Sequence, residues 1–314
     1  MSPQPRRLEV PAHGAEDVLV DEDGRIWTGT ENGSVFRLER DGSVRRIGNT
    51  GGRPLGLELL DAERLLVCDG ELGLLTMSRT TGVVERLVTE VDGVRLLVCN
   101  NAAVARSGDI WFSDSSQTYP LGRWRADLAE RTRTGRLLCR QADGQVEVRL
   151  TGLDFANGVA LAADESFVCV AETGGRCVVR LWLDGDRAGT RDLLVGDLPG
   201  YPDNIALGSD GLIWVTIASP TDPVLEAVRH RLPRPLQLLA SRLPGPLQPA
   251  PKRSARVQAY DGRGTLVHDL ALDASGYHLV TGVREHDGDV WLGSLEEAAV
   301  AVVEGATAPR GASA

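Results

Sequence analysis

The sequence has no long apolar segment and few cysteines. No stretch approaches the roughly 20 apolar residues of a transmembrane helix, and residues 1–15 lack the apolar run of a secretory leader. We therefore expect neither a membrane span nor a signal peptide. The five cysteines are an odd, scattered set without a CxxC pair, which favours a reducing compartment, the cytoplasm.

Basic residues are outnumbered, and lysine is nearly missing. The chain of 314 residues carries 34 Lys and Arg against 44 Asp and Glu, a formal net charge of −10, and Lys252 is the only lysine. This excess of negative charge disfavours nucleic-acid backbones and anionic membrane surfaces, so we expect a small-molecule partner. The oligomeric state is left open by the sequence.

A short unit recurs along the chain: a strand, a turn that often contains Asp-Gly, and a second strand that often begins with an aliphatic residue and Trp. Asp-Gly between alternating apolar runs predicts a β-hairpin, because glycine tolerates the positive φ of a tight turn. The clearest copies are DVLVDEDGRIWTG, AAVARSGDIWFSD, IALGSDGLIWVTI and VREHDGDVWLGSL, and weaker copies lie at 56–70 and 159–172.

Six copies at spacings of roughly 40–75 residues are typical of propeller blades. We therefore predict an all-β fold, one six-bladed β-propeller that spans residues 1–314. Residues 220–252 break the pattern, since they are rich in Pro and Leu and contain helical fragments such as VLEAVRHRL. We expect a short helical insertion in the fifth blade, either a lid or a plain surface insertion.

Four of the copies carry an oxygen ligand in the same register. Counting ten residues back from the start of the second strand gives Glu16, Asn100, Asn157 and Asp203, whereas the other two copies give Leu55 and Val280. In a propeller these positions converge at one mouth of the central channel. Two carboxylates and two amide oxygens are hard ligands that suit calcium, or another divalent cation, better than zinc.

These residues lie in segments that resemble the strictosidine-synthase-like branch of the six-bladed propeller hydrolases, a superfamily with gluconolactonase/regucalcin proteins and paraoxonases. The matching stretches are CNNAAVARSGDIWFSDSS, FANGVALAADESFVCVAETGGRCVVRLWLDG, LPGYPDNIALGSDGLIWV and VREHDGDVWLGSL. The resemblance implies a calcium ion on Glu16, Asn100, Asn157 and Asp203. It also implies hydrolysis of a lactone, ester or phosphotriester at that ion, with Asp203 as general base or nucleophile.

The chain departs from the family pattern at two positions. Many relatives have aspartate where this chain has Asn101. Strictosidine synthases carry a catalytic glutamate where this chain has Thr281, so their amine–aldehyde condensation is not expected here. A non-hydrolytic biosynthetic reaction on the same scaffold and a non-catalytic calcium-binding propeller remain the alternatives.

Further site candidates surround these ligands. His278, just before the sixth inner strand, is a candidate proton shuttle or an ordinary hydrogen-bonded loop histidine. Glu172 is a candidate for orienting a ligand or substrate, or for pairing with Arg176. We assign the following to the substrate pocket: Asn101, Asp114, Tyr119, Glu172, Asn204 and Thr281.

Overall fold

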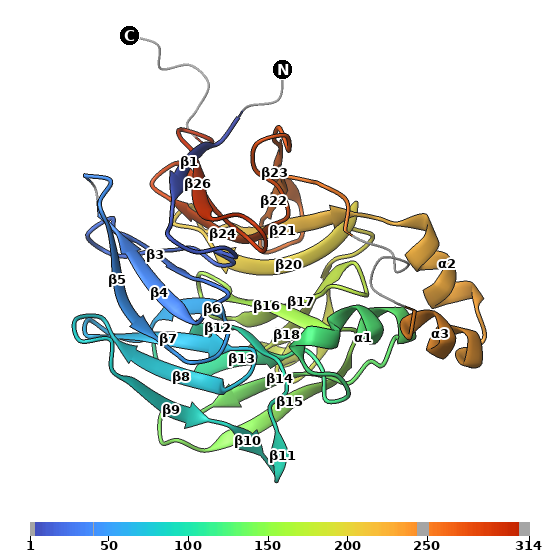
Figure 1. Ribbon diagram of the computed structural model, residues 1–314. Coiled ribbons are helices and arrows are strands. Elements are labelled where there is room, and N and C mark those ends of the chain that lie inside the picture. Colours follow the sequence, from blue (N-terminus) through green and yellow to red (C-terminus); the bar gives the residue numbers. More distant parts are fainter. Residues whose placement is uncertain (1–3, 40, 244–250, 308–314) are drawn as a thin grey trace.

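The computed structural model describes residues 4–39, 41–243 and 251–307 and forms a six-bladed β-propeller (Figure 1). Blades 1 to 3 consist of β2 (Leu19–Val20), β3 (Ile26–Gly29), β4 (Ser34–Leu38) and β5 (Val44–Asn49); β6 (Pro54–Leu59), β7 (Arg64–Asp69), β8 (Gly73–Ser78) and β9 (Val84–Val88); and β12 (Cys99–Val104), β13 (Ile110–Asp114), β14 (Gly135–Arg140) and β15 (Val146–Leu153).

Blades 4 to 6 complete the ring. They consist of β16 (Ala156–Leu161), β17 (Phe167–Glu172), β18 (Cys177–Trp182) and β19 (Arg191–Val195); β20 (Gly200–Leu207), β21 (Ile213–Pro220), β22 (Arg256–Tyr260) and β23 (Leu266–Ala271); and β24 (Val280–His286), β25 (Asp289–Ser294), β26 (Ala299–Val303) and β1 (Arg6–Glu9). A small hairpin, β10 (Glu90–Val91) and β11 (Val94–Arg95), lies between blades 2 and 3. The predicted fold is confirmed, and the six sequence copies are the inner hairpins of the six blades.

The ring is closed by strands from the two ends of the described chain. Strand β1 pairs antiparallel with β26, so residues of the N-terminal segment complete the last blade. The seam with blade 1 is hydrogen-bonded as well: Ser294 donates its backbone N–H to Ala15 O at 2.7 Å, and Thr281 Oγ1 donates to Glu16 O at 2.8 Å.

The hydrophobic core is divided among the six interfaces between neighbouring blades. Each of the six apolar clusters in the described chain lies between two adjacent sheets. The repeated aliphatic-Trp pair supplies part of it, because Trp27 and Trp214 are fully buried. Their indole N–H groups donate to Asp21 and Asp210 in the preceding turns. This hydrogen bond thus holds the turn and the following strand in a fixed arrangement in both blades.

The inner strands pack closely around the channel. At one equivalent position of the inner strands, three blades carry a polar residue and the three blades between them carry glycine. A Cβ on Gly158 would lie only 2.1 Å from Ile205 N, so this position admits no larger residue without moving the next blade. The polar and glycine positions alternate around the ring as Asp17, Gly56, Asn101, Gly158, Asn204 and Gly282.

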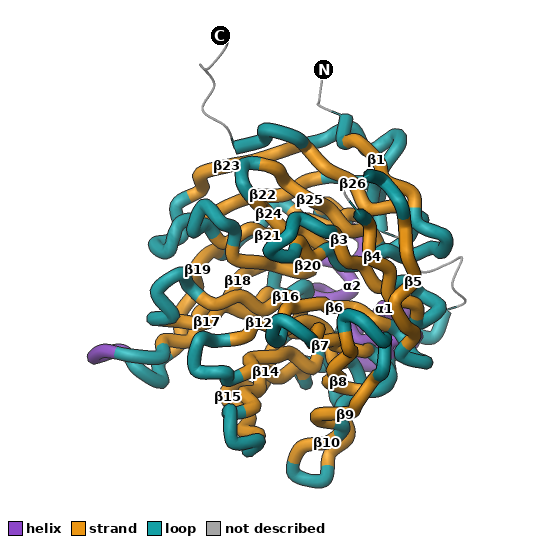
Figure 2. The backbone as a smooth tube through the Cα atoms, turned by 90° about the vertical axis from the view of Figure 1, so that its left-hand side faces the viewer, coloured by secondary structure: helices purple, strands orange, loops and turns teal. Residues whose placement is uncertain are grey.

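Three short helices lie together at one end of the channel (Figures 1 and 2). Helices α2 (Pro223–Arg231) and α3 (Arg234–Ser241) connect β21 to β22 and fall within the predicted insertion, whose residues 244–250 lie outside the described residues. The sequence reading did not anticipate α1 (Trp124–Glu130), which packs against both. The 3-10 turns are η1 (Leu121–Arg123) and η2 (Gly185–Arg187). We call α1, α2 and α3 the cap.

Candidate functional site

The four predicted metal ligands lie at the same end of their blades. Asn100, Asn157 and Asp203 lie near the beginning of β12, β16 and β20, and Glu16 precedes β2. In the three longer strands, pairing with the second strand shifts register at this point. A β-bulge of this kind redirects a side chain from its regular place in the pleat. All four residues line one cavity at the channel mouth.

Blade 6 differs from the sequence count by one residue. The count selects Val280, but the strand pairing places Thr281 at the shifted position, and Thr281 lines the same cavity. The turn explains the difference: Val290 pairs with Glu285, which makes this hairpin turn one residue shorter than the turn of blade 5. The equivalent residue in blade 2 is Leu55, as counted.

The amide groups at this mouth present their oxygens to the cavity. Asn100 Nδ2 donates to Ser115 Oγ at 3.0 Å, and Asn157 Nδ2 donates to Thr173 Oγ1 at 3.1 Å. With both nitrogens engaged, the Oδ1 atoms of Asn100 and Asn157, and Oδ1 of Asp203, are buried without a hydrogen-bond donor in the described chain. Buried acceptors without a donor are costly, so this arrangement favours a ligand that supplies positive charge.

Two carboxylates stand beside these amides. Burial raises the pKa of Asp203 well above its usual range, and the negative charge of Glu16 adds to this effect. Burial also raises the pKa of Glu16, although Arg53 Nη2 lies 3.0 Å from Glu16 Oε2 and opposes that shift. The arginine engages one carboxylate oxygen only. Two acids that ionise poorly together are the setting in which a divalent cation binds favourably.

The donor set fits calcium by its chemistry. It consists of carboxylate and amide oxygens without a nitrogen or sulfur ligand, the preference of a hard cation. No group of three or more His, Cys, Asp or Glu side chains within the described ranges is arranged to hold a metal. Glu16, Asn100, Asn157 and Asp203 are the residues of this chain that would hold the ion. We call these four residues and Thr281 the floor.

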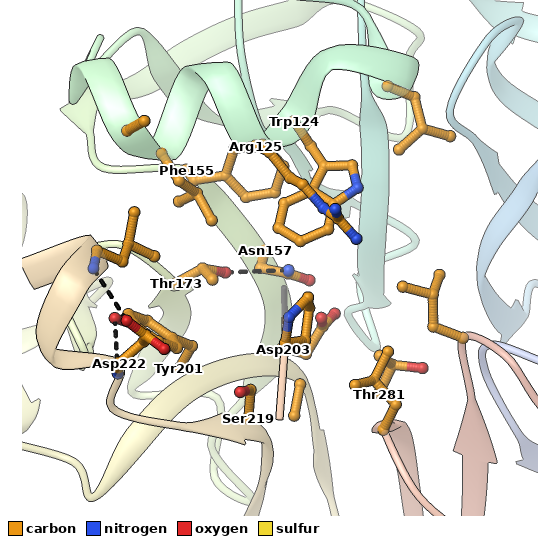
Figure 3. Close-up of a pocket in the computed structure, with 18 of the residues that line it drawn as sticks. Trp124, Arg125, Phe155, Asn157, Thr173, Tyr201, Asp203, Ser219, Asp222 and Thr281 are labelled. Atoms are coloured by element: carbon orange, nitrogen blue, oxygen red, sulfur yellow. Dashed lines mark hydrogen bonds between the residues drawn. The ribbon is translucent and has the colours of Figure 1, made fainter. Parts of the chain in front are cut away.

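The cavity above the floor measures about 210 Å³ and is walled by the cap (Figure 3). Helix α1 contributes Trp124, Arg125 and Leu128, and α2 contributes Leu225 and Val228. The polar groups are thus concentrated at the bottom, and the walls are mainly apolar. This combination is typical of small-molecule sites, where a few polar groups orient a ligand that apolar walls enclose.

The cap is fastened to the propeller by a buried ion pair. Arg229 of α2 is almost fully buried, and its Nη2 lies 2.9 Å from Asp154 Oδ2. The same Nη2 also donates to Gly174 O at 2.8 Å, and Nη1 donates to Leu128 O of α1. One side chain of the insertion therefore joins two cap helices and blade 4.

His278, the candidate proton shuttle, does not line the cavity. Its Nδ1 lies 2.7 Å from Glu297 Oε1 and its Nε2 lies 3.2 Å from Glu296 Oε2. Both ring nitrogens thus lie near carboxylates of the loop between β25 and β26. His278 lies against this loop, while its neighbour Leu279 lines the cavity.

Asn101 and Asp114, assigned to the substrate pocket, have structural partners instead. Asn101 Oδ1 accepts from the backbone N–H of Val159 at 2.9 Å and so ties blade 3 to blade 4. Asp114 is fully buried, its Oδ2 lies 2.7 Å from Arg136 Nη2, and its Oδ1 accepts from Val98 N. Neither lines the cavity. Both side chains instead hold the strands of the propeller together.

Tyr119, Glu172 and Asn204 also lie outside the cavity lining. The hydroxyl of Tyr119, which precedes α1 in the chain, donates a hydrogen bond to Glu130 Oε1 of α1 at 2.7 Å. Glu172 accepts a hydrogen bond from the Cys177 thiol, and burial raises the pKa of this carboxyl. Asn204 is buried among the inner strands, one residue beyond the floor. Of the pocket assignments, only Thr281 reaches the cavity.

The sequence reading missed the cap side of the site. Trp124, Arg125 and Leu128 come from α1, a helix of 7 residues that is too short to show helical periodicity. Phe155 and Tyr201 line the cavity from the loop before β16 and from β20. The segments FANG and GYPDN contain these aromatics beside the predicted ligands, which was the available signal.

Comparison with known proteins identifies the family. A strictosidine synthase family model matches residues 100–186, and a model for the N-terminal part of strictosidine synthase-like proteins matches residues 4–38. Strictosidine synthase-like protein 6 of Arabidopsis thaliana is 32% identical over 280 residues, which cover 86% of this chain and 73% of that protein. The chain belongs to the strictosidine synthase-like family.

Further comparisons cover another curated relative and two solved structures. The adipocyte plasma membrane-associated protein of Gallus gallus is 34% identical over 210 residues, covering 61% of this chain and 50% of that protein. A gluconolactonase from Xanthomonas campestris superposes with a TM-score of 0.68 at 16% identity, covering 94% of this chain and 87% of the other. Regucalcin from Agrobacterium tumefaciens gives 0.67 at 13%, covering 96% and 94%. At such identities the two structures show the shared propeller.

Two general properties accompany these matches. None of the helices formed by residues 4–39, 41–243 and 251–307 is long and apolar enough to cross a membrane. All five cysteines are free thiols, and all are buried.

Proposed function

We propose that this protein is a calcium-dependent hydrolase that acts on a lactone, an ester or a related small molecule at the floor. The observation that carries the proposal is the set of three buried oxygens without donors, on Asn100, Asn157 and Asp203, beneath a walled cavity. Glu16, Asn100, Asn157 and Asp203 would hold the ion. Bound calcium supplies a Lewis acid that polarises a carbonyl or phosphoryl oxygen.

The other roles in the proposed reaction belong to side chains of this protein. Asp203 is the group that accepts a proton from water or attacks the substrate as nucleophile. Ser115 and Thr173 orient the two asparagines through their amide nitrogens. The apolar walls of the cap exclude bulk water, which strengthens every charge interaction on the floor. A gluconolactonase and a calcium-binding protein, regucalcin, share this fold.

The other candidate functions have less support. A strictosidine-type condensation lacks its carboxylate, because Thr281 occupies that position and its hydroxyl is committed to Glu16 O. A purely structural calcium propeller needs no walled cavity over the ion site, and this chain has one. We also propose a reducing compartment, the cytoplasm, which agrees with five unpaired thiols.

Metal analysis of the purified protein, followed by assays against a panel of lactones and aryl esters, tests the proposal. We expect about one calcium per chain and turnover that stops with chelator and returns with calcium. Turnover that persists without any metal would contradict the calcium requirement. A fully loaded protein that hydrolyses no member of the panel would contradict the hydrolase.

A further inference from the structure

Arg125 is a charged side chain in the apolar part of the cavity. It lies on α1, is only partly exposed, and reaches toward the middle of the cavity (Figure 3). Its guanidinium stacks on the Trp124 ring at 5.2 Å. It forms no ion pair with any carboxylate of the described chain, and residues 1–3, 40, 244–250 and 308–314 contain no Asp or Glu.

An unpaired guanidinium in such a place is unfavourable for the empty protein. Removal of a charge from water costs free energy that only a counter-charge restores. Stacking on an aromatic ring offsets part of this cost and leaves the charge unbalanced. The neighbouring Arg229 shows the alternative within the same cap, since it is paired with Asp154. Arg125 therefore has a positive charge that a ligand in the cavity can pair with.

Most of the other basic side chains near the cavity have a carboxylate partner. Arg131, Arg133 and Arg229 lie within 4 Å of Asp154, and Arg229 forms the shortest of these pairs at 2.9 Å. Arg234 lies 3.7 Å from Glu130, and Lys252 lies 3.7 Å from Asp222. Arg125 therefore differs from these neighbours in having no such partner in the described chain.

We propose that the substrate of this site carries an oxyanion group, a carboxylate or phosphate, on an apolar body, and that Arg125 binds this group. The inference rests on the proposed function for the reacting group and adds the second half of the substrate. The planar guanidinium fork matches the oxygens of a carboxylate or phosphate. The apolar body then lies against the walls, and the ester or lactone group faces the floor.

The charges of the cavity support this orientation. Arg125 is the positively charged residue of the α1 wall, whereas the carboxylates of Glu16 and Asp203 lie on the floor, where the proposed ion would neutralise them. The oxyanion group of the substrate therefore has its counter-charge at α1, and the ester or lactone group is the part that faces Asp203. Arg125 is thus a specificity-determining residue and is not part of the bond-breaking chemistry.

Direct binding tests the inference independently of turnover. We would measure, by titration calorimetry, decanoate, decyl phosphate and the neutral methyl decanoate on the wild type, on Arg125→Gln and on Arg123→Gln. Arg123 is the matched control, because it loses the same charge two residues away but is exposed and lies outside the cavity lining. We expect Arg125→Gln to weaken the binding of at least one anion at least tenfold, and Arg123→Gln to change it less than twofold. The stronger of the two anions identifies the oxyanion source.

A turnover experiment adds the link to the reaction. The ratio of kcat/KM for the mono-4-nitrophenyl ester of a dicarboxylic acid to that for a neutral 4-nitrophenyl ester should fall at least tenfold in Arg125→Gln. Arg125→Lys, which keeps the charge but loses the fork, should lie between. If the wild type hydrolyses neither ester, the proposed function fails while the binding data still decide the role of Arg125.

Three outcomes would overturn the inference. The first is equal affinity of the wild type for methyl decanoate and the anions. The second is an equal loss of affinity in Arg123→Gln and Arg125→Gln, which would show a general field effect. The third is anion binding that chelator abolishes and Arg125→Gln leaves unchanged, which would place the anion on a floor-bound metal. Circular dichroism of both variants verifies that the fold is retained.

Discussion

The two ends of the central channel are built by the same inner strands, have cavities of similar volume, and differ in how their buried polar groups are paired. The cavity at the cap end measures about 210 Å³ and the cavity at the opposite end about 230 Å³. At the opposite end Glu58 accepts from Leu59 N at 2.9 Å, and its other oxygen lies 3.1 Å from Arg284 Nη2. At the cap end, oxygens of Asn100, Asn157 and Asp203 are buried together without a donor, whereas at the opposite end Nε of Arg284, a donor, is buried without an acceptor. Size alone does not distinguish the ends, whereas the cluster of buried acceptors does.

This contrast separates structural charges from functional ones. A buried carboxylate with donors on both oxygens stabilises the strands that hold it. A cluster of buried acceptors without donors costs stability and persists where a ligand offsets the cost. The following experiments are designed to break or sharpen this difference between the two ends.

The largest effect is expected for Asp203→Asn. This change keeps the size of the side chain but removes one of the two carboxylates of the floor, so kcat/KM should fall by about 10²–10³, the range seen when a key electrostatic group is removed. Steady-state kinetics on the substrate found in the panel, with circular dichroism for the fold, is the measurement. Activity within a factor of three of the wild type would remove Asp203 from the mechanism.

Removal of Arg229 should destabilise the cap end strongly. Arg229→Met leaves Asp154 buried with weaker counter-charges, and loss of one partner of a buried pair costs about 3–5 kcal/mol. Urea unfolding should show this loss, and KM should rise because the cap walls loosen. The double variant Arg229→Met, Asp154→Asn should recover part of the stability. A single variant as stable as the wild type would show that the pair does not fasten the cap.

Chelation should lower the melting temperature of the wild type. A ligand that binds only the folded state adds about 2.7 kcal/mol at a hundred times its Kd, and its removal subtracts the same amount. Differential scanning fluorimetry with calcium and with chelator measures the shift. Asp203→Asn is the control and should show a much smaller difference. An unchanged melting temperature in the wild type would argue against an ion held at the floor.

The smallest effect is expected at the opposite end. Glu58→Gln removes one partner of the ion pair with Arg284, and we expect a loss of about 1–2 kcal/mol in stability with kcat/KM unchanged within twofold. Urea unfolding and steady-state kinetics check the two parts. A large loss of turnover would contradict the assignment of chemistry to the cap end.

The six blades could be predicted from the sequence because their hairpins are local structures. The Asp-Gly turns and the aliphatic-Trp pairs specify hairpins within about 15 residues, and the register count selected four residues of the floor. It placed Val280 instead of Thr281, because one turn is a residue shorter. Helix α1 was missed because its 7 residues are positioned by packing against α2 and α3, which lie about a hundred residues later.

The placement of the site candidates shows the limit of sequence proximity. His278 and Asn101 each lie next to a residue of the cavity, yet their side chains face carboxylates or the neighbouring blade. The direction of a side chain at a bulge depends on the strand pairing, which the sequence alone does not specify. Arg125 could not be identified from the sequence for a related reason. Its importance lies in the lack of a carboxylate partner in the described chain, which depends on the three-dimensional arrangement.

The seam of the ring has a consequence for how ligand binding and chain integrity are linked. Strand β1 closes blade 6 and ends only a few residues before Glu16, whose backbone is held by Thr281 across the same seam. Opening the ring there would withdraw one of the two carboxylates before the inter-blade cores separate. A cation that bridges Glu16 and Asp203 would then link two segments that are distant in the sequence. Proteolysis between residues 10 and 15 should therefore be slower when the cation is bound.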